Sequence, residues 1–298
     1  MHRPFLFFIA CLSLAGTLSA NEPISFVVSI PPLKWFVEQM IPEADVAVLL
    51  DEGADPHTFA PSPSQVRALH RADVWVTAGL PFERALQRAL HDTKGPLIVA
   101  PDAIAEHDHE SHEAHEEHEE HQHEDPHWWL GFHSHLPVDL ALAHRRFVNV
   151  PENHGGNVAP GAVERTRELL QLEAALRNEL VSLLAPHEGR AFFVLHPAFG
   201  HFAEAFGLRQ MAVEVEGRAP SPRQLRNILE QMRSEGATTL FVQPQGNRAA
   251  AEAIARAADV ELVEINPLRE NWPVMMREIG EALARSFERS SKITRQAR

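Results

Sequence analysis

The chain has 298 residues, enough for one large or two medium-sized domains, and 44% of them are hydrophobic, which supports packed cores. Its formal net charge is −14 and no basic region opposes that charge, so the composition argues against a nucleic-acid partner. These bounds leave binding, transport and catalytic proteins open.

The first twenty residues have the organisation of a secretory signal peptide. Arg3 gives a positive start, residues 6–18 form an apolar run too short to span a bilayer comfortably, and small residues lead to Ala20. We expect cleavage after Ala20 and secretion of the mature chain. Cys11 is a weaker candidate for lipidation, because apolar sequence continues well beyond it. Cleavage would leave no cysteine, so the mature chain can form neither disulfides nor metal sites with thiolate ligands.

Short β-branched runs then alternate with helical patterns, four strands in each half of the chain. The predicted strands are Ile24–Ile30, Asp45–Leu50, Asp73–Ala78, Leu97–Ala100, Ala191–Leu195, Met211–Val215, Thr239–Gln243 and Glu261–Ile265. The predicted helices include Ser62–His70, Phe82–His91, Ser221–Ser234 and Arg248–Ala257, two of which open with a Ser-Pro pair suited to a helix start. Continuous apolar strands alternating with helices predict an α/β fold with parallel sheets covered on both faces. No later segment has the pattern of a transmembrane helix.

A long helix separates the two sets of strands. Leucines recur every three or four residues over Val158–Leu184, and Pro186 follows them. About 27 residues at 1.5 Å each give roughly 40 Å, which is long for a helix inside one domain. We therefore predict a signal peptide over 1–20, an N-terminal lobe over 21–156, a linker helix over 157–186 and a C-terminal lobe over 187–298. A core helix of one large domain is the alternative.

Residues 106–124 form an acidic, histidine-rich block without a basic residue. Nine carboxylates there supply −9 of the net charge, and no apolar period indicates a core element. Imidazole is a common ligand of zinc-like ions, so the block predicts a metal protein. Its histidines are His107, His109, His112, His115, His118, His121 and His123.

Three other histidines lie in a different context. His57 and His196 follow predicted strands, His127 lies where the sequence turns apolar after the acidic block, and each adjoins a proline. Ligands of open α/β sheets bind at the carboxyl ends of the strands, so the three are candidate metal ligands. Six more we interpret as helix or loop residues, although His201 is close enough to His196 to approach the same site: His70, His91, His144, His154, His187 and His201. His133 and His135 are weaker candidates for extending the chelating block.

Five blocks of the chain together resemble one known family. They read GADPHTFAPSPSQ, DPHWWL, RAFFVLHPAFGHFAEAFGL, EGRAPSPRQL and the NPL of EINPLRENW, in the family's order over essentially the whole mature chain. The family is that of metal-binding solute-binding proteins of zinc and manganese ABC importers, cluster A-I, and the zinc members are most similar. An acidic histidine-rich loop between the first two ligand blocks is typical of zinc importers.

The resemblance implies two (β/α)₄ lobes joined by one long helix, with metal in the cleft between them. His57, His127 and His196 match family ligand positions, and the fourth position, an Asp in the family, is Asn266 here. Three imidazoles suit zinc, whereas manganese-type members carry more oxygen ligands. We expect Zn²⁺ held by three histidines, with water, Asn266 or a nearby carboxylate completing a tetrahedron. Gln243 and the pair Gly131-Phe132 also depart from the family pattern.

The preferred function is therefore capture of periplasmic Zn²⁺ and delivery to an inner-membrane ABC permease, without catalysis. A periplasmic zinc chaperone is a further possible partner, the protein is expected to be a monomer outside the membrane, and the acidic block is expected to collect zinc at lower affinity. The affinity for zinc should fall when the pH drops below the ordinary histidine pKa, near 6.5. Two alternatives are a storage or adhesin protein acting through the acidic block, and a zinc hydrolase, because three histidines and a water also describe a catalytic zinc site.

Overall fold

The computed structural model describes residues 23–51, 53–90, 95–99, 125–132, 136–145, 161–214 and 219–296. Its first sheet contains β1 (Ser25–Val28), β2 (Asp45–Val48), β3 (Val74–Val76) and β4 (Leu97–Val99) in the order β2-β1-β3-β4. All three pairings are parallel. The apolar run of β1 is buried along most of its length, as expected for a strand covered on both faces.

The second sheet repeats this plan. It contains β5 (Ala191–Val194), β6 (Arg209–Ala212), β7 (Thr239–Val242) and β8 (Glu261–Glu264) in the order β6-β5-β7-β8, again wholly parallel. The predicted α/β class with two parallel-sheet lobes is therefore confirmed. Strand β6 begins two residues before the predicted Met211, because Arg209 pairs with the first residue of β5 and the ladder, not apolar content, sets its start.

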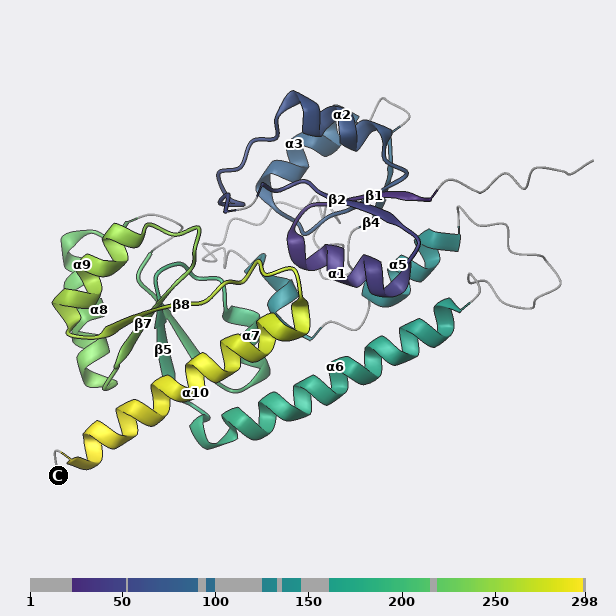
Figure 1. Cartoon of the computed structure of the whole chain (residues 1–298). Coiled ribbons are helices and arrows are strands. Elements are labelled where there is room, and N and C mark those ends of the chain that lie inside the picture. The colour runs from purple at the N-terminus through teal and green to yellow at the C-terminus, as the bar shows by residue number, and fades with distance from the viewer. Residues whose placement is uncertain are drawn as a thin grey trace, which may run out of the picture.

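Helices cover both sheets (Figure 1). Their bounds are α1 (Pro31–Met40), α2 (Pro63–Arg71), α3 (Pro81–Leu90), α5 (Leu136–Arg145), α6 (Ala162–Leu184), α7 (Gly200–Ala205), α8 (Pro222–Ser234), α9 (Arg248–Ala258) and α10 (Trp272–Gln296). The predicted Ser-Pro starts are present in α2 and α8. The Ser62 and Ser221 side chains accept hydrogen bonds from the third helical residue, and each forms a reciprocal capping box with a glutamine.

Helix α6 links the two lobes, and Figure 1 shows it running beneath the first sheet toward the start of β5. Leu169, Leu176, Leu180 and Leu184 form its buried stripe. The predicted start at Val158 lies outside the described residues. The end at Leu184 agrees with the prediction, and a short 3₁₀ turn over Ala185–His187 leads into the second sheet.

A second long helix, α10, lies against α6 and was not anticipated from the sequence. A Cβ on Gly280 would lie 2.5 Å from Leu180 Cδ2, so the absence of a side chain permits this close packing. At its first residue, Trp272 packs on Trp35 and Phe36 of α1, with ring centroids 6.1 and 5.3 Å away. One contiguous apolar core consequently contains residues of both lobes. Among the described helices, none has the length and apolar character needed to cross a membrane.

Candidate metal centre

The structure brings His57, His127 and His196 together from three distant parts of the chain. His57 lies in the loop after β2, His196 directly follows β5, and His127 precedes the 3₁₀ helix η1 (Trp128–Leu130). Two of the three thus lie past the carboxyl ends of parallel strands, where ligands of α/β sheets bind. His57 and His127 precede helix α6 in the chain, and His196 follows it.

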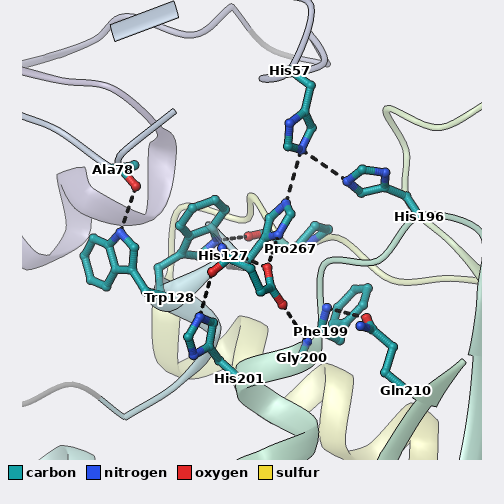
Figure 2. A network of polar contacts seen from close by, with 12 residues as sticks. His57, Ala78, His127, Trp128, His196, Phe199, Gly200, His201, Gln210 and Pro267 are labelled. Carbon is teal, nitrogen blue, oxygen red and sulfur yellow. Dashed lines mark hydrogen bonds and ion pairs between the residues drawn. The ribbon is translucent and has the colours of Figure 1, made fainter. Parts of the chain in front are cut away.

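The three imidazoles point their Nε2 atoms at one another (Figure 2). His57 Nε2 lies 3.3 Å from His127 Nε2 and 3.1 Å from His196 Nε2. A tetrahedral zinc with bonds of about 2.0–2.1 Å separates its nitrogen ligands by about 3.3 Å. One N–H on His57 can satisfy only one of these close approaches, whereas a divalent cation accepts a lone pair from every ring. The donor set therefore fits Zn²⁺.

Carboxylates hold the outer nitrogens of two of these rings. Asp125 Oδ1 lies 2.5 Å from His127 Nδ1, and Glu214 Oε2 lies 2.9 Å from His196 Nδ1. Each carboxylate accepts a hydrogen bond from an N–H on Nδ1, which leaves the Nε2 lone pair free to face a metal. Among the described residues, no other group of His, Cys, Asp or Glu has this metal-binding geometry.

Burial keeps two of the rings neutral. Burial lowers the pKa of His57 to about 4, with the neighbouring His127 and His196 adding to the effect and Asp55 opposing it. His127 is 4% exposed, and this burial lowers its pKa, although Asp125 opposes the shift. Neutral imidazole is the form that binds metal, so the environment favours binding over protonation.

The segment carrying His127 is anchored to both lobes by its two tryptophans. Trp128 Nε1 donates to the Ala78 carbonyl after β3 at 2.9 Å, and Trp129 Nε1 donates to the Pro267 carbonyl after β8 at 2.8 Å (Figure 2). The Trp129 carbonyl in turn accepts from Trp272 Nε1 at 2.7 Å. These buried bonds fix the position of the neighbouring His127.

The loop that receives Trp128 is itself held by a buried carboxylate. Glu83 is 1% exposed and accepts hydrogen bonds from the backbone N–H groups of Ala78, Gly79 and Leu80 at 2.7–2.8 Å. Burial raises the pKa of Glu83, and these three bonds oppose the rise. Glu83 is thus a structural group behind the site, which sequence patterns did not single out.

The other residues predicted from the sequence as possible metal ligands lie in different places. Asn266 lies next to Pro267 and accepts a hydrogen bond from Leu268 N at 3.0 Å, so its side chain oxygen is engaged in a turn. His201 does lie near the site, with Nε2 2.8 Å from the Asp125 carbonyl (Figure 2), whereas His187 contacts Phe287 far along the chain. The acidic block, the signal peptide, His91, His133, His135 and His154 fall outside the described residues, as does the side chain of His144.

Comparison with known proteins agrees with this geometry. Residues 26–286 match the family described as zinc-uptake complex component A, periplasmic. The high-affinity zinc uptake system protein ZnuA of Paracoccus denitrificans is 29% identical over 325 aligned positions, covering 95% of this chain and 98% of its own. A crystal structure of ZnuA superposes with a TM-score of 0.72 at 26% identity, covering 89% of this chain and 99% of that one.

A second solved structure is a zinc-bound ZnuA deletion mutant lacking 138–173, in that protein's numbering. It has a TM-score of 0.71 at 26% identity and covers 89% of this chain and 98% of its own. The family match extends over most of the described fold, from β1 to α10. The chain is therefore a member of the periplasmic zinc-uptake component A family.

Proposed function

We propose that this protein captures Zn²⁺ with His57, His127 and His196 and delivers it to an ABC-type permease. The observation that carries the proposal is that His57 Nε2 lies 3.3 Å from His127 Nε2 and 3.1 Å from His196 Nε2, with His127 and His196 oriented by carboxylates. The family consists of solute-binding proteins of ABC transporters and not of enzymes, which argues against the hydrolase alternative. The ZnuA relatives are named for high-affinity zinc uptake, and one solved relative holds zinc.

The fourth coordination position is proposed to be water, Asn266 or a nearby carboxylate. Asn266 precedes Pro267, whose carbonyl accepts the hydrogen bond from Trp129 Nε1. Because Trp129 is two residues from His127, this bond keeps Asn266 in the neighbourhood of the ligands. Its oxygen already accepts the Leu268 N–H, so metal binding by Asn266 would share or break that bond. Water therefore has the advantage, because it requires no rearrangement of the turn.

We also propose a cellular setting and a division into lobes. We place the protein in the periplasm after removal of residues 1–20, as a monomer that docks on an inner-membrane permease, with a zinc chaperone as a further partner. Its proposed division is an N-terminal lobe over 21–156, a linker helix over 157–186 and a C-terminal lobe over 187–298. The contiguous core shared by the lobes favours small loop movements over a wide hinge closure on metal binding.

The acidic block over 106–124 is proposed to collect zinc at lower affinity and raise its concentration near the three ligands. The dense mixture of imidazoles and carboxylates supports binding of several ions, each weakly. Deleting 106–124 should lower the number of zinc ions bound per chain and leave one tight site. Uptake that is unchanged by this deletion under severe zinc limitation would argue against a collecting role.

Competition with a chromophoric chelator tests the site itself. Replacing His57, His127 or His196 with Ala should lower Zn²⁺ affinity by at least about 100-fold, since each removes one of three protein ligands. His70→Ala is the matched control, because His70 lies on α2 and outside the cluster. Retention of a tight site in the triple variant, and its loss in the 106–124 deletion, would transfer the function to the acidic block.

A further inference from the structure

The tripeptide Asp-Pro-His occurs twice at the site, and the carboxylates of the two copies share one backbone contact and differ in the others. Asp55 Oδ1 accepts from His57 N at 2.9 Å, and Asp125 Oδ1 accepts from His127 N at 3.0 Å, so the two backbone turns match. The second oxygen of Asp55 accepts from the neighbouring Thr58 hydroxyl. The carboxylate of Asp125 instead reaches the ring of its own histidine and the opposite lobe.

The contact with the opposite lobe depends on a glycine. Asp125 Oδ2 accepts from Gly200 N, at the first residue of α7, at 2.9 Å. A Cβ on Gly200 would lie 2.4 Å from that same oxygen, closer than a Cβ atom can approach it without a shift of one of the two. His201 adds a third link, because its Nε2 lies 2.8 Å from the Asp125 carbonyl. Gly200 and His201 together therefore hold Asp125 against the start of α7.

We infer that Asp125 is a positioning residue that orients His127 toward the metal and ties this ligand to helix α7 through Gly200. The inference rests on the proposed metal site and adds the group that sets its geometry. The Asp125 carboxylate joins His127 to the C-terminal lobe. The position of α7 and the orientation of the His127 ring therefore depend on each other. Within the part of the chain that the structure describes, Asp55 makes no such link for His57.

The hydrogen-bond chemistry explains why a carboxylate is required. Both oxygens of Asp125 accept from N–H groups, Oδ1 from His127 and Oδ2 from Gly200. An asparagine offers one acceptor and one donor, so at position 125 its NH₂ group would face another N–H. The His127 ring would then lose its fixed Nδ1–H tautomer, or α7 would lose its link.

The first test compares D125N with D55N in the full chain. D125N should lower Zn²⁺ affinity about 10- to 100-fold, the range found when partners of metal-bound histidines are removed. D55N should cost at most a few-fold, because its amide oxygen can still accept the His57 N–H and its NH₂ group can donate to the Thr58 hydroxyl oxygen. Equal, small effects of the two variants would overturn the inference.

A second readout separates positioning from general damage to the fold. Long-range ¹H–¹⁵N spectra of the metal-free protein at about pH 8 should show His127 with its proton on Nδ1. In D125N the signal should move to the Nε2–H form or to a mixture, whereas in D55N it should not change. A His127 tautomer that is the same in all three proteins would contradict the assignment even if affinity fell.

G200A tests the same carboxylate from the other lobe without altering it. The added methyl must displace Asp125 Oδ2, so G200A should reproduce the affinity loss and the tautomer change of D125N although alanine favours helix more than glycine does. Wild-type affinity in G200A would overturn the link to α7. The proposed metal site fails separately, if replacing the three histidines leaves tight binding intact.

Discussion

The response of zinc affinity to acid follows from the burial of His57 and His127. Three imidazoles with the ordinary pKa of 6.5 would lose about 1000-fold in affinity between pH 7.5 and 5.5, about tenfold for each ring that must release a proton. Burial lowers the pKa of His57 to about 4, so this ring is already neutral at pH 5.5 and its factor of ten disappears. The lowered pKa of His127 makes the affinity loss that this second ring contributes smaller than tenfold.

We therefore expect the affinity to fall less than about 100-fold between pH 7.5 and 5.5. The sign follows from the direction of the shifts: a depressed histidine pKa keeps the neutral, metal-binding form present at lower pH. The threshold near pH 6.5 expected from ordinary histidines is thus moved in the acid direction.

Calorimetry in buffers of different ionisation enthalpy measures both quantities, the affinity and the protons released per zinc. At pH 5.5 we expect fewer than about two protons to be released per zinc, whereas three ordinary histidines would release nearly three. The metal-free fold must be checked at the same pH, because unfolded His57 protonates near 6.5 and the folded ring resists down to about 4, so acid favours unfolding in that window. Release of nearly three protons with a 1000-fold loss would refute the argument.

Three further predictions concern single side chains. Glu173 on α6 is 5% exposed, and burial raises its pKa to about 7, so its ionisation lowers the stability of the fold as the pH rises past 4.5. In denaturant unfolding, Glu173→Gln should therefore stabilise the protein by about 1–3 kcal/mol at pH 8 and have little effect at pH 5. Equal effects at the two pH values would contradict this. Asn266→Asp should narrow the preference for Zn²⁺ over Mn²⁺ in competition assays, since it adds an oxygen anion; an unchanged ratio would remove residue 266 from the site. Glu214→Gln should cost only a few-fold in zinc affinity because the amide oxygen still accepts from His196, whereas Glu214→Ala should cost about 10-fold or more, and identical losses would deny the contact a role.

Local sequence patterns predicted much of the fold. Alternating apolar strands and helices identified all eight strands, and Ser-Pro pairs located the starts of α2 and α8, because both signals depend on neighbouring residues only. Helix α10 escaped prediction although it is 25 residues long. Its packing requires Gly280 against Leu180, a contact between segments a hundred residues apart that no local pattern encodes.

Some residues of the metal site could likewise be predicted from the sequence, and others could not. His57, His127 and His196 were identified from their positions after strands and in family blocks, and the structure brings them together. Asp125 had a signal that was available, since Asp-Pro-His occurs twice. Glu214 had none, because it reaches His196 only through the parallel pairing of β6 with β5.

The central claim is that three Nε2 atoms bind one zinc ion, and a zinc-loaded crystal structure of the full chain tests it most directly. The account predicts Zn–N distances of about 2.0–2.1 Å to His57, His127 and His196, with Nδ1 of His127 on Asp125 and of His196 on Glu214. Tight zinc bound mainly by oxygen atoms, or bound only by the histidines of residues 106–124, would contradict it.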